Sequence, residues 1–515
     1  MRKSRSSFKL SQKILLGLLA AGMTLGAAGV AEAETDPISW VDKTYTGPYN
    51  DIHAYLTDNT DGTSVYNFAD ISGNTLNITK TSGLGMVQLQ SYRTDGTNYV
   101  LVANFNGSDI SNNTMSIAST TNTSGGIFGG AVFMKGVEAV FNDATIQNNL
   151  AKNASKTLTV GGALATSYKG NTDIFLPTNL TFNVTKDASY TGNTISAADG
   201  GTTLYDMGGD YATPSGGGFL ALDVDANATF NISDGATLTI GESGASDTNA
   251  DTIISGIRLT DDSKYTEATL TKTGEGTLTI NSNLNGYYGD FTFNGGTTNI
   301  TEPLGITGKY DLQAGTLNLK DVTVENKASK LISNGFEDYV TDNGDGTMTL
   351  TGLIKYSNGQ TTSYSAAPNT TGTLTTASGT TLTADSLTAQ DGGTVDAEGA
   401  LTVNEAVSAT GENSTITGTN ATVNGTVTAA DKATISLTGT STLSELTASG
   451  ASKVTLAGTI TADTVSGGTA DADGENTSVV QMGNDTTAAK AALDSVDLNG
   501  GTLYLDPVWT NGTQT

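Results

Sequence analysis

The chain has 515 residues, no cysteine and a formal net charge of -28. The lack of cysteine excludes disulfides, thiol catalysis and Cys-based metal sites, and the acidity disfavours nucleic acid and anionic membranes as partners. Thr outnumbers even the 63 Gly, while Trp and Pro are scarce, so the composition favours an all-β protein with many tight turns.

Residues 1–33 have the pattern of a secretory signal peptide. Five basic residues precede the apolar run ILLGLLAAGMTLGAAGV, which ends at an A-x-A cleavage site, Ala31-Glu32-Ala33. We expect cleavage before Glu34, which removes five basic residues and one acidic residue and changes the formal charge from -28 to -32. A retained membrane anchor is the alternative, but no stop-transfer pattern follows the run. A short export signal and the lack of Cys suggest a bacterial envelope protein.

Residues 34–128 are expected to form the first rungs and cap of a β-solenoid, with a hairpin turn at 57–63. The motif DISGNTLNI at 70–78 recurs as DISNNTMSI at 109–117. The spacing of the two copies predicts about two rungs of the 20-residue unit described below.

Residues 129–330 contain Gly-Gly pairs that begin at Gly129, Gly161 and Gly217. Such pairs suit corners where φ is positive or where two backbones approach closely. Asn148 and Asn149 are expected to stack from rung to rung through their side-chain amides. The polar stretch 193–217 is expected to be a loop that leaves the solenoid.

The stretch LTKTGEGTLTINSNLNGYYGDFTFNGGTTNI, residues 270–300, contains three alternating strands, TLTI, DFTF and TTNI, separated by Gly and Asn. We expect one and a half turns of a coil, with glycines at its corners. Tyr287 and Tyr288 are adjacent, so on a strand one would face the core and the other would face outwards.

A hairpin insertion is expected at 331–379, where the turn TDNGDGT at 341–347 separates two apolar segments. Regular rungs are expected at 380–470, and a further, apparently truncated rung at 471–515. Val395, Ile416, Ile435 and Val454 recur with a spacing of about 20 residues and are expected to form one column. A second expected column contains Leu382, Val403, Val423, Leu443 and Ile460.

Each unit of the 380–470 segment follows a strand, turn, strand, turn pattern with one apolar face. Twenty residues at ~3.3 Å each trace a coil of roughly 65 Å perimeter, and such coils stack ~4.8 Å apart by parallel pairing. A propeller would need blades of ~40 residues, so a solenoid of roughly 16 to 20 rungs, ~80 to 100 Å long, is favoured.

Part of the chain resembles a known family. Within 270–300, the residues that match the pattern L-T-K-x-G-x-G-T-L, a Y-x-G centre and a late G-G are Leu270, Lys272, Gly274, Gly276, Leu278, Tyr288, Gly289, Gly295 and Gly296. Thr298 replaces the usual late Leu, and weaker late halves occur at 313–319 and 499–505. This stretch resembles the passenger-associated strand repeat of bacterial autotransporters. The Gly-Gly segments with FNDATIQNN are similar to repeats of polymorphic outer-membrane adhesins.

The resemblance implies a right-handed parallel β-helix of the pectin-lyase-like kind with projecting loops, exported by type V secretion and acting as a non-catalytic adhesin at the cell surface or outer membrane. The partners it implies are a host or neighbouring-cell surface protein or glycan, or a second copy of the chain. A translocator barrel is also expected but is absent from this sequence. We therefore expect a passenger fragment or a truncated product, with a two-partner-secreted exoprotein as an alternative.

An enzyme is the rival interpretation, because β-helices also carry polysaccharide lyases and glycoside hydrolases. Such chemistry needs clustered carboxylates with a nearby basic residue. The candidates are Asn171-Thr172-Asp173, Arg258 with Asp261 and Asp262, and His53. The tripeptide lacks an accompanying Gly-His-Gly, His53 has no Cys or second His nearby, and no serine-nucleophile motif is present. Ordinary turns, a solvated ion pair and a surface His are favoured.

The Asp-rich turns at 58–61, 342–345 and 471–475 faintly resemble calcium loops, but none completes the twelve-residue pattern with a terminal Glu. Turn chemistry is the expected explanation. Trp40 and Trp509 are expected to cover the two ends of the solenoid. We therefore predict no catalytic residue, no cofactor and no metal site, and expect contacts to be made along a rigid face and its loops.

Overall fold

The computed structural model describes residues 37–47, 63–79, 83–90, 100–120, 126–166, 177–209, 211–244, 250–260, 265–356, 358–467, 477–484, 486–505, 509–510 and 513–514. The predicted signal peptide and the turn at 57–63 lie outside these residues, apart from Thr63. The described part is an all-β parallel solenoid, which confirms the predicted fold class. Its one described α-helix is short, α2 (Lys327–Leu331).

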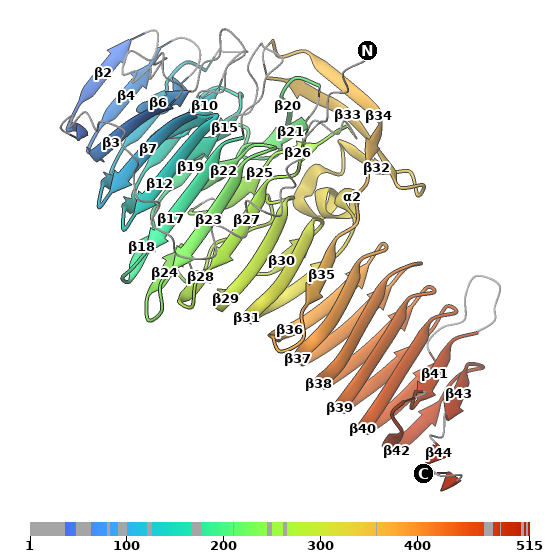
Figure 1. Cartoon of the computed structure of the whole chain (residues 1–515). Coiled ribbons are helices and arrows are strands. Elements are labelled where there is room, and N and C mark those ends of the chain that lie inside the picture. The colour runs from blue at the N-terminus through green and yellow to red at the C-terminus, as the bar shows by residue number, and fades with distance from the viewer. Residues whose placement is uncertain are drawn as a thin grey trace, which may run out of the picture. The chain divides into compact units, whose positions relative to one another are not determined.

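One wall of the solenoid contains sixteen described strands that pair in parallel in chain order (Figure 1). Each strand therefore marks one rung. The strands are β1 (Ile38–Val41), β3 (Thr63–Ser72), β7 (Val100–Asn106), β12 (Val137–Asn142), β17 (Asn179–Val184), β23 (Asn227–Ile232), β27 (Thr269–Thr273), β29 (Asp290–Ile300), β31 (Lys309–Val324), β35 (Thr373–Thr376), β37 (Thr394–Thr410), β38 (Thr415–Ala430), β39 (Thr434–Ala448), β40 (Lys453–Gly467), β41 (Val479–Met482) and β43 (Thr502–Leu505).

Two further parallel walls close the rungs of the N-terminal half. One contains β2 (Thr44–Gly47), β4 (Thr75–Ile78), β9 (Thr114–Ile117), β14 (Leu150–Asn153) and β19 (Thr194–Ala197). The other contains β6 (Val87–Gln90), β11 (Val132–Lys135), β16 (Leu164–Thr166), β22 (Leu220–Leu222) and β25 (Ile253–Ser255). Alternate residues of each strand point inwards, so the walls enclose one continuous apolar core.

Phenylalanines stack inside the first rungs. Phe68, Phe105, Phe141, Phe182 and Phe230 occupy one inward column, and successive ring centroids lie 4.6 to 5.0 Å apart. All five rings are buried. Offset stacking adds about 0.5–1.5 kcal/mol per pair beyond the burial of apolar area, so this column stabilises the pairing of each rung with the next.

The rungs of the N-terminal half are about twice as long as predicted. Asn106 and Asn142, which are bonded on neighbouring rungs, lie 36 residues apart, and Asn183 and Asn231 lie 48 apart. The interval between DISGNTLNI and its second copy is therefore one rung, and the prediction of two rungs is wrong. The 20-residue period read from 380–470 does not hold here, because three walls and wide corners take up more chain per turn.

The rungs of the C-terminal half have the predicted length. Val395, Ile416, Ile435 and Val454 pair in register from β37 to β40 and are all buried. Hydrogen-bonded residues of neighbouring rungs lie 21 and 19 residues apart here. The first predicted column is therefore confirmed.

The second predicted column is correct only in part. Val403 pairs with Val423, but Leu382 pairs with Leu401, and Leu443 lies two residues past the partner of Val423. The register shifts within the pairing of β36 (Thr381–Gln390) with β37, after Ala384, and within the pairing of β38 with β39, after Gly418 and Gly425. Apolar spacing alone cannot show these slips.

The Gly-Gly pairs form corners, as predicted. Gly129, Gly161 and Gly217 have φ of 70°, 71° and 76°. The second glycine of the first two pairs lies against the next rung, so a Cβ on Gly130 would overlap the carbonyl oxygen of Gly162, and one on Gly162 that of Gly218. Only glycine supplies both the left-handed backbone and the close approach at this corner.

Asparagines form a buried ladder beside the second wall. The side-chain amide of Asn74 donates to Asn113, Asn113 to Asn149, Asn149 to Asn193, and Asn193 to Asp251, over 2.8 to 2.9 Å. All five side chains are buried. The prediction that Asn149 stacks between rungs is therefore confirmed.

Asn148 does not belong to this ladder. It is exposed and has a left-handed φ of 55°, at the corner where Asn112 of the previous rung has 57° and Gly192 of the next has 73°. Asn tolerates this backbone better than most residues. The prediction for Asn148 is wrong because each corner needs one left-handed residue before the inward asparagine.

The stretch 270–300 completes one and a half turns, as predicted. β27 and β28 (Thr277–Ile280) both pair with β29, so DFTF and TTNI are two parts of one strand. Lys272 takes the inward position between Phe230 and Phe293. Its ammonium donates to the carbonyl oxygens of Gly274 and Gly295 at the corner. A Cβ on Gly296 would collide with this ammonium.

A six-stranded mixed sheet lies outside the walls and surrounds a second apolar core. It contains β20 (Leu204–Asp206), β21 (Tyr211–Pro214), β26 (Ile257–Arg258), β32 (Val340–Asp342), β33 (Thr347–Lys355) and β34 (Thr361–Pro368). The stretch 193–217 is thus only partly a loop, since β19 belongs to a wall. The turn at 341–347 joins β32 and β33 as an antiparallel hairpin, as predicted.

Candidate functional site

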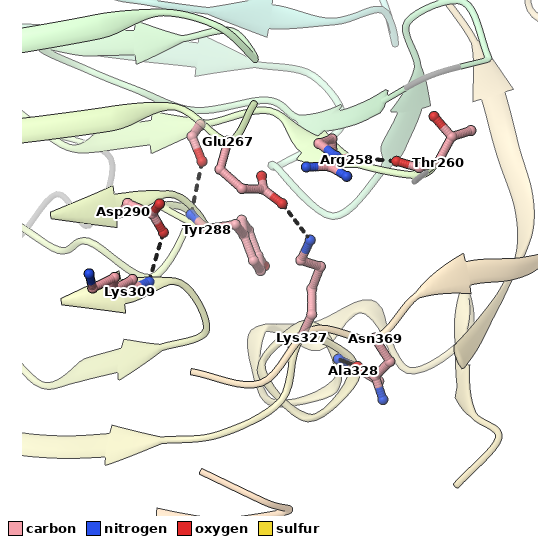
Figure 2. Close-up of polar contacts among 10 residues, drawn as sticks. Arg258, Thr260, Glu267, Tyr288, Asp290, Lys309, Lys327, Ala328 and Asn369 are labelled. Atoms are coloured by element: carbon pink, nitrogen blue, oxygen red, sulfur yellow. Dashed lines mark hydrogen bonds and ion pairs between the residues drawn. The ribbon is translucent and has the colours of Figure 1, made fainter. Parts of the chain in front are cut away.

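The segment 325–372 leaves the solenoid between β31 and β35, which pair directly with each other, and it packs back against the rungs through α2. Figure 2 shows the Lys327 side chain extending from this helix to Glu267, with the ammonium 3.0 Å from the carboxylate. The amide of Ala328 donates to the Asn369 side chain at 2.8 Å. The first contact therefore fixes the start of this segment, which we call the excursion, to the solenoid, and the second joins the two ends of the excursion to each other.

Lys330 forms a second anchor at this junction. Its ammonium donates to the carbonyl oxygens of Tyr287 and Gly305 and lies 4.7 Å from the centre of the Tyr288 ring. Burial lowers the pKa of Lys330 to about 7, although the carboxylate of Glu325 opposes this change. The two carbonyl oxygens and the aromatic face replace part of the hydration that the ammonium loses on burial.

An open pocket of about 400 Å³ lies between the excursion and the solenoid. We call it the junction pocket, and it is lined by Gly201, Pro214, Ser215, Gly216, Thr252, Ile254, Asn283, Asn285, Gly286, Ser333, Asn334 and Phe336. The solenoid supplies Thr252, Ile254 and the turn 283–286. The π-helical turn η1 (Ile332–Phe336), which follows α2, supplies the opposite wall.

Hydrogen bonds fix the two walls of the junction pocket. The side-chain amide of Asn334 donates to the carbonyl oxygen of Asn285 at 2.7 Å and to the Tyr288 hydroxyl at 2.9 Å. The Asn283 side chain accepts from the Asn285 amide at 2.5 Å, which closes a tight turn. Ser333 is exposed at the rim. The side chains of Asn334 and Asn283 are thus held in place before any ligand arrives.

A buried acid lies in a separate, much smaller cavity of about 20 Å³. The Tyr211 hydroxyl donates to Asp223 at 2.7 Å. Burial raises the pKa of Asp223 to about 8, against the opposing effects of the Tyr211 bond, the Val224 amide and Lys135. A cavity of this size admits about one water, so the cluster holds strands together and has no room for a substrate.

The structure tests few of the sequence-derived site residues. His53, Asn171-Thr172-Asp173, Asp261 and Asp262 lie outside the described residues, as do the Asp-rich turns at 58–61 and 471–475. Arg258 is partly buried on β26, and its guanidinium donates to the carbonyl oxygen of Thr260 at 3.2 Å (Figure 2).

The Asp-rich turn at 342–345 is described in full. Asp342 accepts from the Gly344 amide at 2.8 Å, and Asp345 accepts from the Thr347 amide at 3.0 Å. Hydrogen bonds from Thr347 lower the pKa of Asp345. These carboxylates therefore complete turns, as the sequence indicated. Trp40 lies on the first described rung and packs on Phe68, while the side chain of Trp509 lies outside the described residues.

The prediction for the tyrosine pair is wrong in one respect. Both Tyr287 and Tyr288 are 1% exposed, and neither lies on a strand. Tyr287 belongs to the solenoid core, whereas Tyr288 belongs to the second core under the excursion. The outward ring is covered because a later segment of the chain folds over it, with Lys330 in contact.

Sequence reasoning missed the junction pocket and the buried lysines. Lys330 and Lys327 stand out only as two of 24 basic residues in a strongly acidic chain. The turn Asn283-Leu284-Asn285-Gly286 gave a turn signal without any sign of a pocket. Tertiary folding brings these segments together, so no local pattern marks the site.

No known protein family, curated protein or solved structure matches this chain. Among the described residues, no group of three His, Cys, Asp or Glu side chains is placed to hold a metal ion. Over the same part of the chain we find no helix with both the length and the apolarity needed to cross a bilayer.

Proposed function

We propose that this chain is an exported, non-catalytic adhesin of the autotransporter passenger class that acts at a bacterial cell surface. The observation that supports this most is a polar row on the outer face of the solenoid. Asn142 donates to Asn106 at 2.6 Å, Asn183 to Asn142 at 2.7 Å and Asn231 to Asn183 at 3.0 Å.

Such rows continue into the C-terminal rungs. Asn318 donates to Asn299 at 2.8 Å, and Thr417 donates to Asp396 at 2.7 Å. A stack of rungs repeats the same hydrogen-bonding groups every ~4.8 Å, so a partner can make many weak contacts at once. This arrangement suits adhesion to a host or neighbouring-cell surface, or to a second copy of the chain.

Beads coated with the mature chain, residues 34–515, provide the direct test. We expect the beads to clump or to bind epithelial or bacterial cells, and we expect denatured chain on the same beads to do neither. Treating the target cells with protease or with glycosidases separates protein partners from glycans. Coated beads that neither clump nor bind any cell type would rule out the adhesin function.

A further inference from the structure

We propose that the junction pocket binds a neutral saccharide, and this inference rests on the proposed adhesin function because it names the ligand class. None of the described residues that line the pocket carries a titratable side chain, although the chain contains 52 acidic residues. This part of the lining therefore offers neither a cation for an acidic sugar nor a carboxylate for an amine.

The hydrogen-bonding groups of the pocket match sugar hydroxyls. Three asparagines from opposing walls line it, Asn283 and Asn285 on the solenoid and Asn334 on the excursion. Asn334 uses its amide hydrogens on Asn285 and Tyr288, which leaves its carbonyl oxygen as an acceptor without a partner among the described residues. The side-chain amide of Asn285 has no protein partner in the same part of the chain. Amides both donate and accept, as vicinal hydroxyls require.

The remaining lining combines hydroxyl groups with three apolar side chains. Ile254 and Phe336 are largely buried and Pro214 adds a third apolar side chain, so the C–H face of a sugar ring can pack on the edges that they expose. The volume of about 400 Å³ falls within the usual range of ~300–1,000 Å³ for small-molecule sites. Lys327 and Lys330 hold the excursion wall in position, which reduces the ordering cost of binding.

The neighbouring cation does not alter this chemistry. Lys330 is 1% exposed, and its ammonium is already bonded to the carbonyls of Tyr287 and Gly305. It is absent from the lining. A phosphate or carboxylate in the pocket would therefore have only amides and hydroxyls to replace its hydration, which disfavours sialylated or sulfated glycans relative to neutral ones.

The test uses the purified mature chain and a panel of neutral hexosides, N-acetylhexosaminides and their disaccharides, with sialylated and sulfated glycans for comparison. Binding is measured by saturation-transfer NMR and on a printed array. Ser333→Trp places an indole at the pocket rim and should reduce binding at least tenfold. Asn285→Ala removes one amide and should reduce it about fivefold, as expected for one neutral hydrogen bond.

Two controls match these variants away from the pocket. Ser444 is exposed, and its hydroxyl donates to a backbone carbonyl at 3.2 Å, as that of Ser333 does at 3.0 Å. Asn404 is exposed and makes one long contact, 3.3 Å, to Asp385. Ser444→Trp and Asn404→Ala should bind like the wild type, and circular dichroism checks the fold of all four variants.

Binding of neutral sugars that Ser333→Trp abolishes and Ser444→Trp leaves intact supports the inference. Binding of acidic glycans alone, binding of no saccharide, or binding unchanged by Ser333→Trp would overturn it. The bead assay separates the two proposals. Beads that adhere equally well with Ser333→Trp leave the adhesin function standing without this pocket, whereas sugar binding without cell adhesion supports the pocket alone.

Discussion

Replacing Asn149 with Ala should strongly destabilise the buried asparagine ladder. The Asn149 side chain is fully buried, donates to Ile110 and Asn193 at 2.8 Å each, and accepts from the Asn113 side chain at 2.8 Å. The backbone amide of Asn113 also donates to it at 3.2 Å, so Asn149→Ala leaves four buried polar groups short of one partner, each worth about 1–3 kcal/mol. With partial relaxation, we expect a loss of about 3–5 kcal/mol.

Hydrogen exchange followed by mass spectrometry is the appropriate assay, because a stack of rungs can open locally without unfolding as a whole. Protection should fall first in the rungs that contain Asn113 and Asn193. Asn231→Ala is the matched control, since Asn231 is exposed and donates one bond of 3.0 Å to Asn183 on the outer row. We expect a loss below about 1 kcal/mol there. Equal effects of the two substitutions would refute the reasoning.

Three other substitutions test the corners and the buried charges. Gly130→Ala should cost more than about 3 kcal/mol in urea unfolding, because its Cβ would overlap the Gly162 carbonyl oxygen, whereas Gly235→Ala has free space and strains only its φ of 75°. Lys330 has a lowered pKa of about 7, so the unfolded chain binds more protons than the folded chain between pH 7 and 10.5. The free energy of unfolding of the wild type should therefore rise across that window, relative to that of Lys330→Met, by up to about 5 kcal/mol. Parallel pH profiles of the two proteins would contradict this. Asp223 has a raised pKa of about 8, so the folded chain binds more protons than the unfolded chain between pH 3.8 and 8. Wild-type stability, followed by thermal melts, should therefore fall across that window relative to Asp223→Asn. A difference in melting temperature between the two proteins that does not change with pH would show that Asp223 is not buried as a neutral acid.

Local patterns predicted the parts of the fold that depend on local rules. The alternation in 270–300 and the positions of Val395 to Val454 follow from strand geometry, and the corner role of Gly129 follows from its need for positive φ. The sequence predicts stacking for both Asn148 and Asn149, and only the inward Asn149 stacks. These features require no knowledge of distant segments.

Features that depend on the length of a turn or on distant contacts could not be predicted. The recurrence of DISGNTLNI at 109–117 gives a distance along the chain, but only the structure shows whether that distance holds one rung or two. The sequence places one of the two adjacent tyrosines outside the solenoid core, but it does not show that Lys330 of the excursion packs over the Tyr288 ring. The junction pocket likewise needs residues from 201 to 336.

The rungs of the C-terminal half pair in register, so the length of the solenoid can change by one whole rung at a time. Thr434 pairs with Lys453, so a deletion of 434–452 would join Ala433 to Lys453 and return the chain to the same column. Insertion of one such unit would lengthen the stack by a single spacing of ~4.8 Å and leave the neighbouring corners unchanged. Gain or loss of such units is therefore a simple genetic route to a longer or shorter scaffold, and it leaves the excursion and its pocket untouched.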